Sequence, residues 1–189
     1  MLMKRYYFAA IFMLISAISI GQTKIGGIVM PNVMKAGDEY LKINGGGIRE
    51  KMTLDLYIGV LYLREKSSDA DKIIKADEPM GIKMRVISSF VTKENMEEAI
   101  RTGFEKSTGD NTSPIQSKID ELINAGFKQE IGVGDIFDLI YMPGKGTSLS
   151  KNNTLVLTIT GLDFKQALFG IWLCDDPADE NLKAKMLGQ

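Results

Sequence analysis

Histidine is absent from this sequence, and cysteine occurs only once, at Cys174. Without histidine the chain cannot form a Ser-His-Asp or Cys-His catalytic group, or a zinc site that uses imidazole ligands. A single cysteine excludes a disulfide within the chain. Because Cys174 directly follows Trp172 and Leu173, we expect a small buried hydrophobic residue there rather than a reactive thiol. The sequence predicts no metal and no cofactor.

A strong charge of either sign is also lacking. The 23 Lys and Arg residues nearly balance the 24 Asp and Glu residues, which gives a formal net charge of −1. Nucleic-acid binding depends on basic surfaces that neutralise phosphates. The composition therefore argues against a nucleic-acid partner, and it makes no prediction of oligomeric state.

The N-terminus carries the first positive feature. A short basic start precedes an uncharged apolar run over residues 6–20, which ends among small residues. A membrane-spanning helix needs about 20 apolar residues, whereas this three-part pattern is typical of a secretory signal peptide. We predict cleavage before Gln22, removal of residues 1–21, and export to the periplasm or the medium with no stable membrane span afterwards. A retained single-span anchor is the alternative.

The remaining residues, 22–189, are predicted to form a single domain. Patterns of strand residues and turns predict strands at 24–33 (interrupted at Pro31), 39–43, 48–63, 81–90, 136–141 and 154–160, with turns at 44–47 and 143–146. Helical periodicity predicts one helix over 93–107, capped by Thr92, and a second over 113–124, capped by Ser113. It predicts two more helices, one that begins after a cap at Asp163 and one that begins at about Asp179. Strand runs separated from helix runs predict an α+β fold with an antiparallel sheet.

The segment 48–63 suggests a binding surface. Side chains alternate between the two faces of a strand, and here one face is a continuous apolar set: Met52, Leu54, Leu56, Ile58 and Val60. The other face passes from charged to apolar, as the wall of a cleft for an amphiphile would: Arg49, Lys51, Thr53, Asp55, Tyr57, Gly59 and Leu61. Arg49 could pair bidentately with a carboxylate, and the Tyr57 hydroxyl could be a second donor. Arg85 is a further candidate anion contact, and a solvated sheet face is the alternative.

Several motifs resemble the chalcone isomerase family. These are Asn44-Gly45-Gly46-Gly47-Ile48-Arg49 followed by a strand that ends Ile58-Gly59-Val60-Leu61-Tyr62-Leu63, then Ile100-Arg101-Thr102-Gly103-Phe104, and then Asp163-Phe164-Lys165-Gln166-Ala167-Leu168 with Ile171-Trp172-Leu173. The order of elements agrees from about residue 28 to the C-terminus, and the likeness extends to bacterial members that carry signal peptides. The resemblance implies an open-faced β-sandwich, in which a layer of helices covers a large antiparallel sheet.

The family's enzymes close a chalcone to a flavanone in a cleft lined by an arginine, a threonine, a tyrosine and a lysine. The resemblance places the arginine at Arg49, and the threonine at Tyr57 or Leu56, depending on how the strands are aligned. The tyrosine and the lysine should follow the 100–104 helix. Residues 107–114 contain neither, and the nearest lysine, Lys118, lies inside the next predicted helix. Non-enzymatic members bind fatty acids through an arginine and hydroxyl partners.

We therefore expect an exported, non-catalytic protein that binds a carboxylated amphiphile such as a fatty acid. Arg49 is the expected anchor, and Tyr57, Thr53 and Arg85 are the other candidate contacts. One alternative is an intramolecular lyase that acts on a flavonoid-like or other unsaturated ketone, with Arg49 polarising the carbonyl. Another is a scaffold whose own side chains fill the cleft. The ligand itself, an amphiphilic carboxylate or a polyphenol, is left open.

Overall fold

The computed structural model describes residues 23–189, so the predicted signal peptide lies outside the described residues. A seven-stranded antiparallel sheet has its strands in sequence order, and a separate two-stranded hairpin precedes it. The hairpin comprises β1 (Thr23–Ile25) and β2 (Ile28–Met30). The sheet comprises β3 (Val33–Ala36), β4 (Glu39–Lys51), β5 (Leu54–Leu63), β6 (Met80–Val86), β7 (Ile136–Met142), β8 (Gly146–Lys151) and β9 (Thr154–Ile159).

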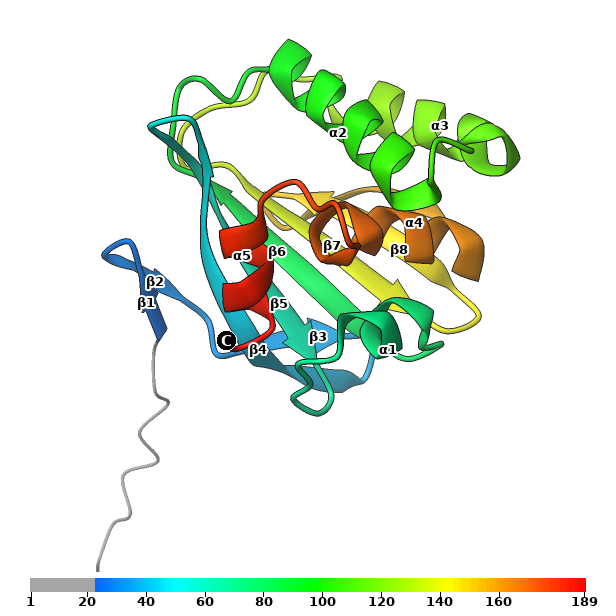
Figure 1. The fold of residues 1–189 in the computed structure, drawn as a ribbon, viewed down its shortest axis with the longest axis horizontal. Helices are drawn as coiled ribbons and strands as arrows, with labels where there is room; N and C mark the ends of the chain where they lie inside the picture. The colour runs from blue at the N-terminus through cyan, green and yellow to red at the C-terminus, as the bar shows by residue number, and fades with distance from the viewer. Residues whose placement is uncertain (1–22) are drawn as a thin grey trace, which may run out of the picture.

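The helices lie mainly over one face of this sheet (Figure 1). They are α1 (Ala70–Lys75), α2 (Lys93–Thr108), α3 (Gln116–Gly126), α4 (Leu162–Leu173) and α5 (Glu180–Met186), with a 3₁₀ turn, η1 (Ser113–Ile115), before α3. The larger apolar core lies between the helices and the sheet. The predicted α+β fold with a helix-covered antiparallel sheet is confirmed. No helix among residues 23–189 is both long and apolar enough to cross a membrane.

Capping explains where some of the helices begin. The Thr92 side chain accepts a hydrogen bond from the Asn95 backbone N–H and so begins α2, as predicted. The Asp179 carboxylate accepts from the Leu182 N–H and begins α5 in the same way. Two predicted caps are wrong, because Ser113 belongs to η1 and Asp163 lies inside the first turn of α4. Strand β8 and helix α1 were not predicted.

The predicted turn at residues 44–47 is wrong. Strand β4 continues through these glycines to Lys51, with a register shift at Asn44, and the chain reverses only at Met52 and Thr53. Two of the glycines, Gly45 and Gly47, lie against α5: a Cβ atom at Gly47 would lie 2.6 Å from Cδ of Lys185. A Cβ atom at Gly46 would instead lie 2.8 Å from the Gly59 carbonyl oxygen of β5. The predicted single strand over 48–63 is therefore the end of β4, a turn, and the whole of β5.

Both faces of β5 are buried, which differs from the predicted pattern of one core face. Ile58, Val60 and Tyr62 belong to a second apolar cluster, which also contains residues of β2, β3 and β4. Tyr57 and Leu61 lie in the larger core on the helix side. Met52 and Leu54, which were predicted to be core residues, are exposed. The reason is that Met52 lies in the turn and Leu54 follows it directly.

Candidate functional site

Arg49 and Tyr57 lie directly opposite each other on neighbouring antiparallel strands. The register of β4 and β5 pairs these two residues, because the chain reverses at the intervening turn. The guanidinium carbon of Arg49 lies 5.7 Å from the centre of the Tyr57 ring, within the range of a cation–π contact. The sequence predicted that these side chains act together, but along one strand rather than across two.

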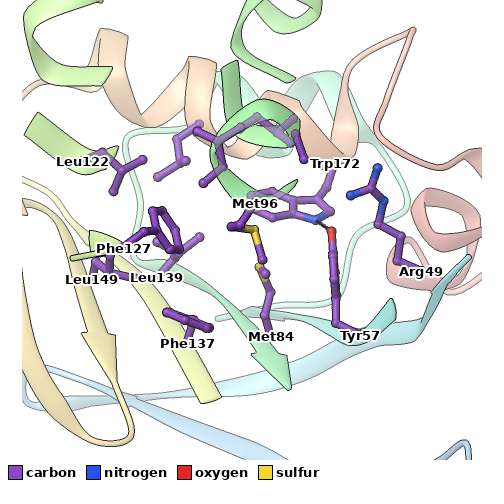
Figure 2. Close-up of a pocket in the computed structure, with 14 residues that line it drawn as sticks. Arg49, Tyr57, Met84, Met96, Leu122, Phe127, Phe137, Leu139, Leu149 and Trp172 are labelled. Atoms are coloured by element: carbon purple, nitrogen blue, oxygen red, sulfur yellow. Dashed lines mark hydrogen bonds between the residues drawn. The ribbon is translucent and has the colours of Figure 1, made fainter. Parts of the chain in front are cut away.

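Trp172 of α4 completes this group of side chains. Its indole Nε1 donates a hydrogen bond of 2.9 Å to the hydroxyl oxygen of Tyr57 (Figure 2). The Tyr57 proton has no acceptor among the described residues, so it is available to a ligand. Burial raises the pKa of Tyr57 above its ordinary value, although the nearby Arg49 charge acts in the opposite direction. The hydroxyl therefore remains protonated and can donate.

Arg49 has no counter-charge in ion-pair contact among the described residues. Its Nε atom is buried and has no hydrogen-bond partner, and the guanidinium forms no ion pair with any residue in 23–189. A buried donor without a partner costs about 1–3 kcal/mol, and more when the group is charged. Such a group is expected where a ligand supplies the missing acceptor. The arrangement therefore suits an anion.

Two adjacent cavities meet at this pair, and both are lined by Arg49, Tyr57, Met96 and Ala99. In the outer cavity, the centre of a water molecule can occupy a volume of about 240 Å³. This cavity is also lined by Lys51, Met52, Leu54, Leu56, Phe90, Val91 and Asn95. The inner cavity offers only about 30 Å³ and is also lined by Met84, Ile100, Leu122, Phe127, Phe137, Leu139, Leu149, Leu168, Ile171 and Trp172. The outer cavity beside Arg49 therefore has room for a ligand, whereas side chains nearly fill the inner cavity.

The structure does not bring the other two candidate contacts to this site. Thr53 lies in the exposed turn between β4 and β5 and lines neither cavity. Arg85 pairs in register with Ile58, so it lies on the opposite face of the sheet from Tyr57. The Thr53 prediction assumed one long strand over 48–63, and the chain reversal at this turn excludes it. The alternation of side chains along β6 keeps Arg85 away from this site.

Two further residues bear on catalysis. Lys118, the lysine nearest to the expected family position, donates from Nζ to the Asp163 carboxylate at 2.9 Å and lines neither cavity. Cys174 is partly buried, and burial raises the pKa of its thiol. This direction disfavours a thiolate and agrees with the expectation that Cys174 is not a reactive thiol.

Residues 22–188 match a protein family that is described as chalcone isomerase-like. This chain belongs to that family. The chalcone isomerase-like fold predicted from the sequence is thereby confirmed. No curated protein matches the chain by sequence.

Among solved structures, the chalcone isomerase-like chain is similar to a fatty-acid binding protein of Arabidopsis thaliana. The TM-score is 0.66 at 15% sequence identity, and the alignment covers 85% of this chain and 92% of the plant protein. At this level of identity the likeness establishes a shared fold.

Proposed function

We propose that this protein binds the carboxylate of an amphiphile such as a fatty acid. The observation that carries the proposal is the buried, unpartnered Nε of Arg49 beside a tyrosine whose proton is free. A carboxylate would satisfy both groups at once, and hydrogen bonds between charged groups are stronger than those between neutral ones. The structural likeness to a fatty-acid binding protein supports the same conclusion.

The chemistry of the site favours an ionised head group. A guanidinium has only donors, and the Tyr57 hydroxyl already accepts a hydrogen bond from Trp172. The indole N–H of Trp172 is used in that bond, so Arg49 and Tyr57 are the two side chains at the junction that offer donors to a ligand. An ionised carboxylate only accepts, whereas an alcohol, an amine or a protonated acid brings a donor that these groups would leave without a partner.

We propose further that the protein is not an enzyme. Polarising a ketone and ordering a phenolate beside an alkene need several placed donors. Residues 107–114 hold neither the tyrosine nor the lysine expected of the family's enzymes, and Lys118 is engaged by Asp163. Acceleration of chalcone cyclisation over the spontaneous rate, abolished by loss of Arg49, would instead establish the lyase.

Replacement of Arg49 should weaken binding and stabilise the empty protein. A charge-assisted hydrogen bond contributes about 1.5–3 kcal/mol, so Arg49→Met should weaken carboxylate binding roughly tenfold to a hundredfold. The same change removes a partly buried guanidinium whose buried Nε has no partner among the described residues, so the unliganded variant should unfold at a higher urea concentration. Displacement of a fluorescent fatty acid and urea denaturation measure the two effects.

Arg85→Met is the matched control, since Arg85 lies on a strand of the same sheet but on the opposite face. It should leave the affinity unchanged. Tyr57→Phe should cause a smaller loss than Arg49→Met because it removes a neutral donor. Equal affinity in Arg49→Met and the wild type would place the head group elsewhere, and failure of Arg49→Met to fold would show that Arg49 is structural.

We also propose that the protein is exported and processed, on the basis of the N-terminal sequence pattern. The mature protein should then begin at or near Gln22 and be recovered outside the cytoplasm. N-terminal sequencing and intact-mass measurement on cell fractions test this directly. A full-length chain that is retained in the membrane fraction and still carries Lys4 and Arg5 would show that the segment is an anchor.

A further inference from the structure

The inner cavity cannot hold an amphiphile's tail as it stands in this structure. A single water molecule needs roughly 10–15 Å³ of such space, and the inner cavity offers about 30 Å³. Yet it lies directly behind the Arg49–Tyr57 pair, and apart from Arg49, Tyr57 and Trp172 its lining is entirely apolar. A tail that is anchored at this pair would reach it without crossing any other polar group.

Two methionines occupy the centre of this region. Met84 rises from β6 and Met96 descends from α2, and the two side chains point toward each other (Figure 2). On one side of them lie Tyr57 and Trp172, and on the other lies a set of apolar residues: Leu122, Phe127, Phe137, Leu139 and Leu149. Each methionine is 5% exposed. They therefore separate the head-group end of the cavity from its apolar end.

We propose that Met84 and Met96 form a movable plug, which we call the methionine plug, and that its displacement sets how long a tail the site accepts. The inference rests on the proposed function. Methionine is unbranched and has three rotatable bonds, so it can change rotamer at a lower cost than a branched side chain. The residues at the far end are leucines and phenylalanines, which are stiffer. The plug is thus the part of the lining best able to yield.

The alternative position for the tail is the outer cavity. That cavity is open to solvent, and its rim includes the exposed side chains of Met52 and Phe90. A tail placed there would remain partly in water. A tail placed behind the plug would be enclosed between α2, α4 and the sheet, and burial of each additional methylene should strengthen binding by about fourfold.

The test is a series of saturated carboxylates: hexanoate, octanoate, dodecanoate and hexadecanoate. For the wild type, affinity should rise about fourfold per methylene until the enclosed space is full and should then level off. The double variant Met84→Ala/Met96→Ala should continue to gain affinity at longer chain lengths. The double variant Met84→Leu/Met96→Leu keeps the volume but is branched, and it should bind hexadecanoate roughly tenfold more weakly while binding hexanoate as before.

Met80→Leu is the control, because Met80 lies on the same face of β6, is 2% exposed and lines neither cavity at Arg49. Its chain-length profile should match the wild type, and circular dichroism confirms that each variant is folded. One profile shared by the wild type and both double variants would overturn the methionine plug alone. Failure of every carboxylate to bind would overturn the proposed function and the plug with it.

Discussion

Gly45→Ala should destabilise the protein by about 3 kcal/mol, at the upper end of the cost of overpacking a core. A Cβ atom at Gly45 would overlap the carbonyl oxygen of Lys185 and would lie 2.9 Å from that of Met186 and 3.1 Å from the Gly188 nitrogen. These are backbone atoms, which cannot rotate away as a side chain can. The C-terminal helix α5 would have to leave its position on β4.

Other contacts of α5 show that this movement would be costly. The Asn44 side chain donates to the carbonyl oxygen of Met186 at 2.7 Å and also binds the backbone of Ser67. Leu182 and Met186 are fully buried, and they lie against Gly59 of β5, which is paired with Gly47. Displacement of α5 would expose these side chains and break the Asn44 contact.

Urea denaturation of Gly45→Ala against Gly132→Ala measures the effect. Gly132 has no atom within 4 Å of where its Cβ would lie, and its φ is not positive. Its replacement should change stability by no more than about 0.5 kcal/mol. If Gly45→Ala and Gly132→Ala both unfold at the wild-type urea concentration, then the close approach of α5 to β4 does not require a glycine at position 45.

This glycine run also shows what the sequence could not reveal. A turn was predicted at residues 44–47 because glycine adopts positive φ without steric cost. None of the three glycines has a positive φ in the structure. Gly45 and Gly47 make room for a helix about 140 residues later in the chain, and Gly46 makes room for the neighbouring strand β5. Local patterns cannot distinguish these two uses of glycine.

The structure places Arg49 opposite Tyr57, although the predicted single strand that carries both is wrong. The role of the two residues in binding stays a prediction. The turn between them was missed because its tip is Met52, which has a φ of 59°, where a turn would ordinarily carry Gly or Asn. Trp172 was missed because its place on the apolar stripe of α4 indicated only a core residue. The indole N–H was the available signal, since a buried tryptophan usually needs an acceptor.

Lys165 is a second buried group that periodicity did not reveal. It is 0% exposed, and its Nζ donates to the carbonyl oxygens of Ile73, Ile74 and Ala76 at 2.9, 2.7 and 2.7 Å. These carbonyls lie at the C-terminal end of α1, where a helix leaves acceptors without partners. The ammonium group thus ties α1 to α4. Replacement by methionine would fill the space but leave these acceptors unsatisfied, so Lys165→Met should be less stable at neutral pH.

The difference in stability between the wild type and Lys165→Met should grow as the pH rises. Burial lowers the pKa of Lys165 to about 8, from 10.5 in the unfolded chain. Between these values the unfolded state binds more protons than the folded state, so the wild type gains stability with pH, by roughly 2 kcal/mol at about pH 9.5. The raised pKa values of Tyr57, Tyr62 and Tyr141 act in the opposite direction only near and above pH 10.

Urea unfolding at pH 7 and pH 9.5 checks this for the wild type, Lys165→Met and a control, Lys106→Met. Lys106 pairs with Asp176 at the surface, and its removal should shift both measurements equally. The tyrosines are common to all three proteins, so their contributions cancel in each difference. If the difference between the wild type and Lys165→Met is the same at both pH values, Lys165 remains fully protonated in the folded protein, and its three carbonyl contacts outweigh the cost of burying the charge.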